Sequence, residues 1–153
     1  MDENTKRKAL LMIPYGLFVL GTKKGEELNA STVNFVTQAS FRPPLIVVGV
    51  KRDSISFDYI KGEGVFTLNM LATGQKELAA SFFKPGRLGE VPFYIKETGA
   101  PILKDAPAFI ECRVTDIVDR GDHAVVVGEV INAGIHYEAE PLTMAETGWK
   151  YGG

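Results

Sequence analysis

The sequence predicts a mainly β protein, in which at least six strands form an antiparallel barrel and the helices are few and short. Three observations carry this prediction. The chain contains 16 glycines and 8 prolines, which divide it into short segments of the kind that turns connect. These segments are either apolar runs or alternations of apolar and polar residues, as in strands. Neither a dinucleotide-binding glycine fingerprint nor a phosphate-binding P-loop is present.

The N-terminal part is expected to hold one helix and three strands. Asn4 can cap the helix and Pro14 ends it. The polar segment 23–26 reads as a hairpin turn, and Pro43-Pro44 breaks the chain before an apolar run that is typical of a strand buried on both faces. The expected elements are a helix over 4–13 and strands over 15–22, 28–40 and 45–50.

The remainder is expected to alternate short helices with strands and to end in a long hairpin. Ser54 caps one helix and Gly62 closes it, whereas apolar residues at helical spacing mark the other. Asp119-Arg120-Gly121-Asp122 joins the two long strands. The expected elements are helices over 54–62 and 75–83, a strand over 65–71, a loop-rich stretch over 84–106, and strands around 110–115 and over 123–135.

The composition restricts the function before any motif is considered. A chain of 153 residues is long enough for one sizeable core, so residues 1–153 are interpreted as a single domain. Seventeen Lys and Arg against nineteen Asp and Glu give a net charge of −2, which lacks the basic excess of a nucleic-acid-binding protein. One cysteine excludes an internal disulfide, and with only two distant histidines we expect no metal site.

The N-terminus superficially resembles a secretion signal, because the basic residues 6–8 precede an apolar run over 9–21. However, Asp2 and Glu3 lie in the basic region, and the run is too short to span a bilayer as a helix. We therefore expect a soluble, cytoplasmic protein without a membrane segment, which suits a single free thiol.

Residues 29–40 have an unusual composition for a strand. Seven of these twelve residues are Asn, Ser, Thr or Gln, and none is charged. A strand of neutral donors and acceptors suits a partly buried polar heterocycle, whose edge alternates the same groups. A polar edge strand without a ligand is the alternative.

The segment 51–56 lies between a buried strand and a helix start. Its two cations and two serine hydroxyls, together with the free N–H groups of the helix, suit a phosphate group. An ordinary capped helix with solvated charges is the alternative here. Because one strand connects this segment to the polar strand, the two together suggest one ligand with a polar ring and a phosphate.

The usual catalytic groups are sparse. Cys112 reads as a core thiol, and His123 is either a substrate contact or a histidine at a strand end. No serine-nucleophile elbow is present, so we assign no catalytic side chain. Phe83, Trp149 and Tyr151 are aromatic residues that could stack on a flat ring.

The order and spacing of several motifs resemble the flavin reductase-like, FMN-binding split-barrel family, and in particular its flavoredoxin, high-molecular-weight rubredoxin and diflavin flavoprotein branches. The resemblance covers nearly the whole chain. The motifs are Thr32-Val33-Asn34 leading to Gln38-Ala39-Ser40-Phe41 and Pro43-Pro44, Lys51 to Ser56, Phe66 to Leu71, Ala100 to Leu103, Ile110-Glu111-Cys112, Gly121-Asp122-His123 leading to Val127 to Val130, Pro141-Leu142-Thr143 and Tyr151-Gly152-Gly153.

The resemblance implies a six-stranded antiparallel Greek-key split barrel and a homodimer with FMN at the dimer interface. By matched position, Ser31, Thr32, Val33 and Asn34 would lie along the flavin ring edge or the ribityl chain, and Ala39 and Ser40 would meet the ring. Lys51, Ser54 and Ser56 would hold the phosphate, Phe83 would sit beside the flavin, and His123 would lie on the nicotinamide side. Relatives often have Ala and Ser where this chain has Val33 and Asn34, and Met144-Ala145-Glu146 replaces aromatic or basic residues of some branches.

The function implied is an NAD(P)H-dependent flavin oxidoreductase. Hydride would pass from the nicotinamide to flavin N5, and the electrons would continue to free flavin, ferric iron or an electron-transfer protein. Two alternatives stay open: a flavoredoxin-like FMN electron carrier with little NAD(P)H activity, and a non-redox split-barrel interaction module. The sequence does not distinguish NADH from NADPH, a tightly bound FMN from an exchanging one, or which subunit's flavin Trp149 and Tyr151 would reach.

Overall fold

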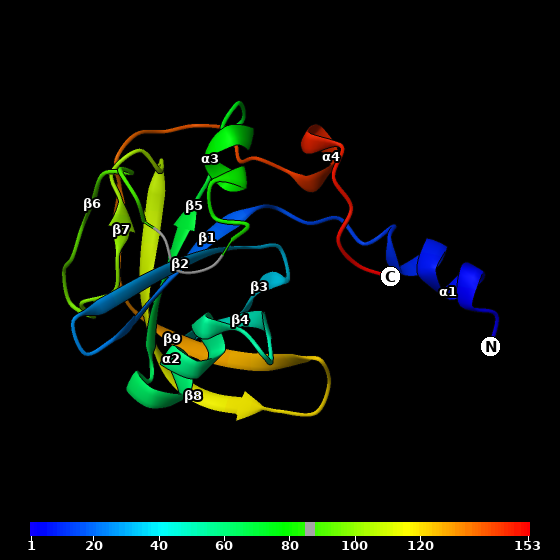
Figure 1. Ribbon diagram of the computed structural model, residues 1–153, viewed down its shortest axis with the longest axis horizontal. Coiled ribbons are helices and arrows are strands. Elements are labelled where there is room, and N and C mark those ends of the chain that lie inside the picture. Colours follow the sequence, from blue (N-terminus) through cyan, green and yellow to red (C-terminus); the bar gives the residue numbers. More distant parts are fainter. Residues whose placement is uncertain (85–87) are drawn as a thin grey trace.

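The computed structural model describes residues 1–84 and 88–153 and shows an antiparallel β sheet with short helices around it (Figure 1). Within these residues the main sheet has seven strands in the order β2-β1-β5-β8-β9-β4-β3, and β6 and β7 form a separate pair. The elements are α1 (Glu3–Leu10), β1 (Phe18–Lys24), β2 (Glu27–Val33), β3 (Val36–Phe41), β4 (Pro44–Lys51), α2 (Ile55–Glu63), β5 (Val65–Met70), α3 (Lys76–Ala80), β6 (Phe93–Tyr94), β7 (Ile102–Leu103), β8 (Ala108–Val118), β9 (His123–Ile135) and α4 (Met144–Thr147).

Two apolar clusters form the core of the described chain. One cluster lies between the sheet and α2, where Phe57 and Ile60 of the helix pack with Phe66 and Val126 of the strands. The other joins the start of β1 to α3 and the C-terminal part of the chain through Leu17, Phe82 and Leu142, among others. Because α2 lies against β1, β2 and β4, its N-terminus is fixed beside the polar strand β2.

The polar segment expected as one strand over 28–40 is divided into β2 and β3. The chain turns tightly at Asn34, whose carbonyl accepts from the amide of Val36 at 3.0 Å. Phe35 then lies over Gly49 of β4, where a Cβ atom would approach the Phe35 Cβ to 2.9 Å. The absence of a side chain at Gly49 therefore makes room for the turn, and this division accounts for seven strands where the sequence indicates six.

Helices and turns differ from the sequence predictions mainly at their ends. α1 begins one residue before the predicted range and is capped by Asp2 instead of Asn4, because the Asp2 carboxylate accepts from the amide of Thr5. It buries none of its residues and projects from the sheet (Figure 1). α3 covers only part of 75–83. The stretch 84–106, in which Pro85 and Gly86 lie outside the described residues, contains β6 and β7, and the sequence did not predict α4.

A buried carboxylate fixes the loop after β6. Glu111 of β8 is fully buried and accepts hydrogen bonds from the amides of Glu97 and Thr98, the Thr98 hydroxyl and the Asn132 side chain, at 2.7–3.1 Å. Burial by itself raises the pKa of Glu111, but these hydrogen bonds together outweigh it and hold the pKa below its ordinary value. No described helix is long and apolar enough to cross a membrane.

Candidate functional site

A buried polar cluster joins β2 to the beginning of α2. Asn29 is 1% exposed, and its side-chain Nδ2 donates to the hydroxyls of Thr22 and Ser56 at 3.1 and 2.9 Å. The Ser56 hydroxyl also lies 2.7 Å from the hydroxyl of the partly exposed Ser31. The cluster thus extends from the interior to the surface beside the first turn of α2.

The helix start itself offers a cation and backbone donors. The Ser54 hydroxyl caps α2 by accepting from the amide of Phe57 at 3.1 Å and donates to the Lys51 carbonyl at 2.6 Å, so its hydrogen is already used. The amides of Ile55 and Ser56 have no intrahelical acceptor, because they precede the first helical hydrogen bond. The exposed Lys51 Nζ lies 3.7 Å from Asp53. A phosphate here would therefore meet Lys51 and amide groups more readily than the Ser54 hydroxyl.

The two neighbouring cations of this segment have different partners. Arg52 forms an ion pair of 2.8 Å with Asp119, in the turn between β8 and β9, and its amide donates to the Asp122 carbonyl. Lys51 pairs only loosely and lies opposite His123 in the β4–β9 ladder. Lys51 is therefore the cation of this segment that is better placed for an anionic ligand.

An aromatic cluster lies beyond the turn at Asn34. The ring of Phe35 lies 5.2–5.5 Å from the rings of Tyr15, His123 and Tyr151. The Tyr151 hydroxyl is 2.6 Å from His123 Nε2, and Asn34 Nδ2 donates to the Tyr151 carbonyl at 3.1 Å. The structure thus connects the predicted residues Asn34 and His123 through Tyr151.

Asp122 and Tyr151 at this cluster have perturbed pKa values. Asp122 Oδ1 lies 2.9 Å from His123 Nδ1, and this hydrogen bond lowers the pKa of Asp122. Burial raises the pKa of Tyr151, while the positive charge of Lys51 opposes the increase. With Asp122 as the acceptor at Nδ1, a neutral His123 carries its proton there and presents Nε2 to the Tyr151 hydroxyl.

A third contact attaches β2 to the segment after α3. The Thr32 amide donates to the Phe82 carbonyl at 3.2 Å, and its hydroxyl donates to the Ala79 carbonyl at 2.6 Å. Phe83, which is 54% exposed, therefore lies close to the end of β2 and packs edge-on against Trp149 with ring centroids 4.8 Å apart. Lys76 Nζ lies 4.9 Å from the centre of the Trp149 ring. The exposed Phe83 and the partly buried Trp149 thus form an aromatic pair bordering the polar strand.

The remaining predicted positions are less connected. Val33 packs toward the core between the sheet and α2, so its side chain is directed away from the surface. Ala39 and Ser40 lie on the edge strand β3, where a register shift between Gln38 and Ser40 interrupts the ladder. The described contacts do not connect them to the other predicted residues. Cys112 is buried, and desolvation raises its pKa to about 12, as expected of a core thiol.

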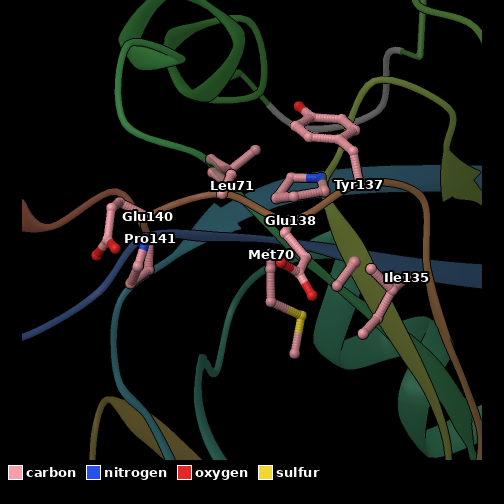
Figure 2. A pocket seen from close by; sticks show the side chains of 10 residues that line it. Met70, Leu71, Ile135, Tyr137, Glu138, Glu140 and Pro141 are labelled. Carbon is pink, nitrogen blue, oxygen red and sulfur yellow. The ribbon is translucent and has the colours of Figure 1, made fainter.

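Two cavities lie near the C-terminal part of the chain. The larger, of about 730 Å³, includes Tyr15, Trp149 and Tyr151 in its lining and so borders the aromatic cluster. The other, of about 580 Å³, is lined by the side chains around Met70, Ile135 and Glu138 (Figure 2). It contains none of the predicted site residues. The larger cavity is therefore the one that adjoins the candidate site.

The donor set of the site fits a flavin mononucleotide. A cation and helix amides suit a phosphate, neutral amide and hydroxyl groups suit a ribityl chain and a heterocycle edge, and a partly exposed aromatic pair suits a flat ring. Within the described residues no cluster of His, Cys, Asp and Glu could hold a metal ion. Sequence reasoning counted Asn29 among the polar residues of the strand but gave it no role of its own, and it gave none to Phe35. Asn29 was detectable in principle, because asparagine is depleted in strands and stands here in the middle of one.

Such a site on an antiparallel sheet suits a ligand with a flat ring and a phosphate, and comparison with known proteins identifies the family. Residues 10–153 match the family model described as the flavin reductase like domain, so the chain belongs to the flavin reductase-like family. It is 30% identical over 148 residues to the high molecular weight rubredoxin of Moorella thermoacetica, covering 90% of this chain and 63% of the relative. It is 31% identical to the NADH-dependent FAD reductase of Streptomyces globisporus, covering 86% and 76%.

Solved structures give the same assignment. The flavin reductase PheA2 superimposes with a TM-score of 0.82 at 29% identity, covering 94% of this chain and 93% of that one. The NADH:FAD oxidoreductase SgcE6 of Streptomyces globisporus superimposes with a TM-score of 0.79 at 28% identity, over 88% and 84%. Some relatives are much longer, and the chain spans only 25% of diflavin flavoprotein A 1 of Synechocystis.

Proposed function

We propose that this chain binds FMN and catalyses the reduction of flavin by NAD(P)H. The observation that carries the proposal is that this member of the flavin reductase-like family presents a loosely paired cation and helix amides at the start of α2, neutral hydroxyl and amide groups on and after β2, and an aromatic cluster around Phe35. The relatives named for NADH-dependent reduction of FAD support the reaction, and a neighbour named as an FMN-binding protein supports the cofactor.

Each group has a proposed role. Lys51 and the first amides of α2 would hold the phosphate, with Ser56 and Ser31 beside it, while Ser54 fixes the helix start. Thr32 to Asn34 and the edge residues Ala39 and Ser40 would line the ribityl chain and ring. Phe83 would flank the ring, and His123 would contact the nicotinamide. We place Val33, Ala39 and Ser40 by their matched positions alone, and the other residues also by the polar, aromatic and charged groups around them.

Bound FMN supplies an acceptor for hydride at its ring, so the protein needs no nucleophile of its own. The chain's contribution is to bind and orient both partners and to limit the access of water. His123, held between Asp122 and Tyr151, keeps a fixed orientation at the nicotinamide side. This division of work agrees with a sequence that has two histidines and one buried thiol.

The proposal extends to the assembly. We propose that residues 1–153 act as one flavin-binding domain, that the sheet closes as a Greek-key split barrel, and that two copies associate with the flavin at their interface. The exposed apolar residues of β8 and β9, such as Ile117, Val118 and Val125, and the unburied helix α1 are consistent with an associating surface. The electrons would leave to free flavin, ferric iron or a protein acceptor.

A second function is favoured by part of the comparisons. The relatives named as a rubredoxin and a diflavin flavoprotein are longer than this chain, which spans 63% and 25% of them. An FMN electron carrier with little NAD(P)H activity is therefore the alternative. It shares the flavin site and differs in the use of nicotinamide.

The two functions are separated by one experiment. Purified protein is loaded with FMN and mixed anaerobically with NADH or NADPH while the flavin absorbance is followed. Fast bleaching supports the reductase, and slow bleaching by both nucleotides, with fast reduction by a protein or chemical donor, supports the carrier. Failure to take up FMN at all would contradict both.

A further inference from the structure

We infer that the buried Asn29 is a positioning residue, which directs the hydroxyl of Ser31 to act as a hydrogen-bond donor toward the phosphate of the flavin. The inference rests on the proposed function, because it concerns the same binding site. It adds a residue that lies below the ligand surface and has no place among the predicted contacts. Its basis is the direction of each hydrogen bond in the cluster between β2 and α2.

The side-chain amide of Asn29 sets the direction of the hydrogen bonds in this cluster. An asparagine side-chain nitrogen carries two hydrogens and can only donate. Here Nδ2 uses one toward Thr22 Oγ1, at 3.1 Å, and one toward Ser56 Oγ, at 2.9 Å. Among the described residues Oδ1 of Asn29 has no partner, so the amide is held through its nitrogen. Ser56 Oγ is therefore an acceptor on its inner side.

The hydroxyl hydrogen of Ser56 has one available acceptor among the described side chains. Ser56 is 1% exposed, and leaving a buried hydroxyl hydrogen unpaired is costly. Within the described chain, the other side-chain oxygen in hydrogen-bond contact with Ser56 Oγ is Ser31 Oγ, at 2.7 Å. Ser56 therefore donates to Ser31.

Ser31 is the outer end of this chain and is partly exposed. Because its oxygen already accepts from Ser56, its own hydrogen is available to an outside acceptor. It lies beside the first turn of α2, where unpaired amides and Lys51 favour an anionic oxygen. Donation along the chain from Asn29 to Ser56 to Ser31 polarises each following hydroxyl, which strengthens the last hydrogen bond to a charged acceptor.

The test is a double-mutant cycle on flavin selectivity. Dissociation constants of FMN and riboflavin are measured for the full chain, and the ratio of the riboflavin value to the FMN value isolates recognition of the phosphate. Ser31→Ala removes the terminal donor and is expected to lower this ratio about 5-fold to 10-fold. Asn29→Asp replaces the buried donor by an acceptor, so that Ser56 donates inward and Ser31 donates to Ser56. This variant is expected to lower the ratio at least as much.

The combination of the two variants separates the hydrogen-bond chain from simple charge repulsion. If Asn29 acts through Ser31, the Asn29→Asp effect on the ratio becomes much smaller in the Ser31→Ala background. If the new carboxylate only repels the phosphate, the two effects multiply, and the inference is overturned. If Asn29→Asp leaves the ratio unchanged, Asn29 already accepts from both hydroxyls, which also overturns it.

The controls keep the result interpretable. Thr22→Val removes the other partner of Asn29, which is not on the path to Ser31, and should leave the ratio within 2-fold of the unaltered protein, a threshold of about 0.4 kcal/mol by the usual conversion. If Asn29→Asp fails to fold, the uncharged Asn29→Leu takes its place, with an expected decrease of about 2-fold that disappears in the Ser31→Ala background.

The behaviour of the unaltered protein separates this inference from the proposed function. Binding of neither flavin contradicts the proposed function itself. Equal binding of FMN and riboflavin leaves a flavin-binding function intact but overturns the inference, because no phosphate is then recognised. Preference for FMN together with the coupled loss described above supports it.

Discussion

Glu111 and Asn29 are two polar side chains buried to the same extent on different strands of one sheet, and they have opposite consequences. Glu111 receives four hydrogen bonds, three from the loop after β6, which they hold in place, and one from Asn132 of β9. Asn29 instead donates outward through hydroxyls that end at a partly exposed serine. A buried polar cluster whose donors converge on its centre stabilises the fold, whereas one whose donors point outward can serve a ligand.

The comparison predicts that the Glu111 cluster dominates stability. Glu111→Ala leaves the amide of Thr98 and the side chain of Asn132 without their acceptor in a buried region. We expect a loss of about 3 kcal/mol in the free energy of unfolding, measured by urea denaturation. Glu97→Ala, which removes an exposed carboxylate nearby, should cost less than about 0.5 kcal/mol. A change in the FMN-to-riboflavin selectivity of folded Glu111→Ala would contradict the assignment of the Glu111 cluster to stability alone.

The stability contribution of Glu111 is also expected to depend on pH. Because the hydrogen bonds outweigh desolvation and lower the pKa of Glu111, the ionised carboxylate stabilises the folded state. This contribution is complete above the ordinary glutamate pKa of about 4.3 and is lost as the pH falls through the lower folded value. The stability difference between the unaltered protein and Glu111→Gln should therefore shrink as the pH is lowered from about 6 to about 3, an interval that includes the ordinary glutamate pKa. A constant difference over that interval would contradict this assignment.

Lys51, near the start of α2, should show the opposite pattern, with a large effect on ligand binding and a small effect on stability. Lys51→Ala should weaken FMN binding about 10-fold and riboflavin binding little, because the lost interaction is with the phosphate. Its unfolding free energy should change by less than about 0.5 kcal/mol, since the side chain is exposed. Arg52→Ala is the matched control, because that cation is engaged with Asp119. Unchanged FMN affinity in Lys51→Ala would remove Lys51 from the phosphate site.

The fold could be predicted largely from local signals. Turn residues, apolar runs and caps located most strands and α2, because each depends on a few consecutive residues. The division of the polar strand was missed, because it depends on Gly49 of β4 making room for Phe35. The cap of α1 differed by two residues, because Asp2 and Asn4 are both suitable caps and the sequence does not rank them.

The site was predictable only at the positions that the family motifs mark. The motifs led to Lys51, Asn34 and His123, which the structure connects through the pairing of β4 with β9 and through the contacts of Tyr151. They gave no signal for the pairing of His123 with Tyr151, 28 residues further along the chain, because such a contact has no local pattern. The direction of the Asn29 hydrogen bonds also requires the positions of three side chains from three elements, which no sequence spacing encodes.

The smallest expected effect tests whether the aromatic cluster around Phe35 contributes to ligand binding. Tyr151→Phe removes the hydroxyl that meets His123 Nε2 while keeping the ring beside Phe35. One partly exposed hydrogen bond corresponds to a change of about 2-fold to 5-fold, which we expect in the apparent affinity for NAD(P)H during anaerobic flavin reduction. FMN affinity should stay unchanged, because the phosphate contacts that we propose lie at the start of α2. Tyr137→Phe, whose hydroxyl bonds the Asp105 carbonyl, is the control. An equal effect of both variants would show that Tyr151 contributes only to packing, and would confine the functional polar groups to the Asn29 cluster and Lys51.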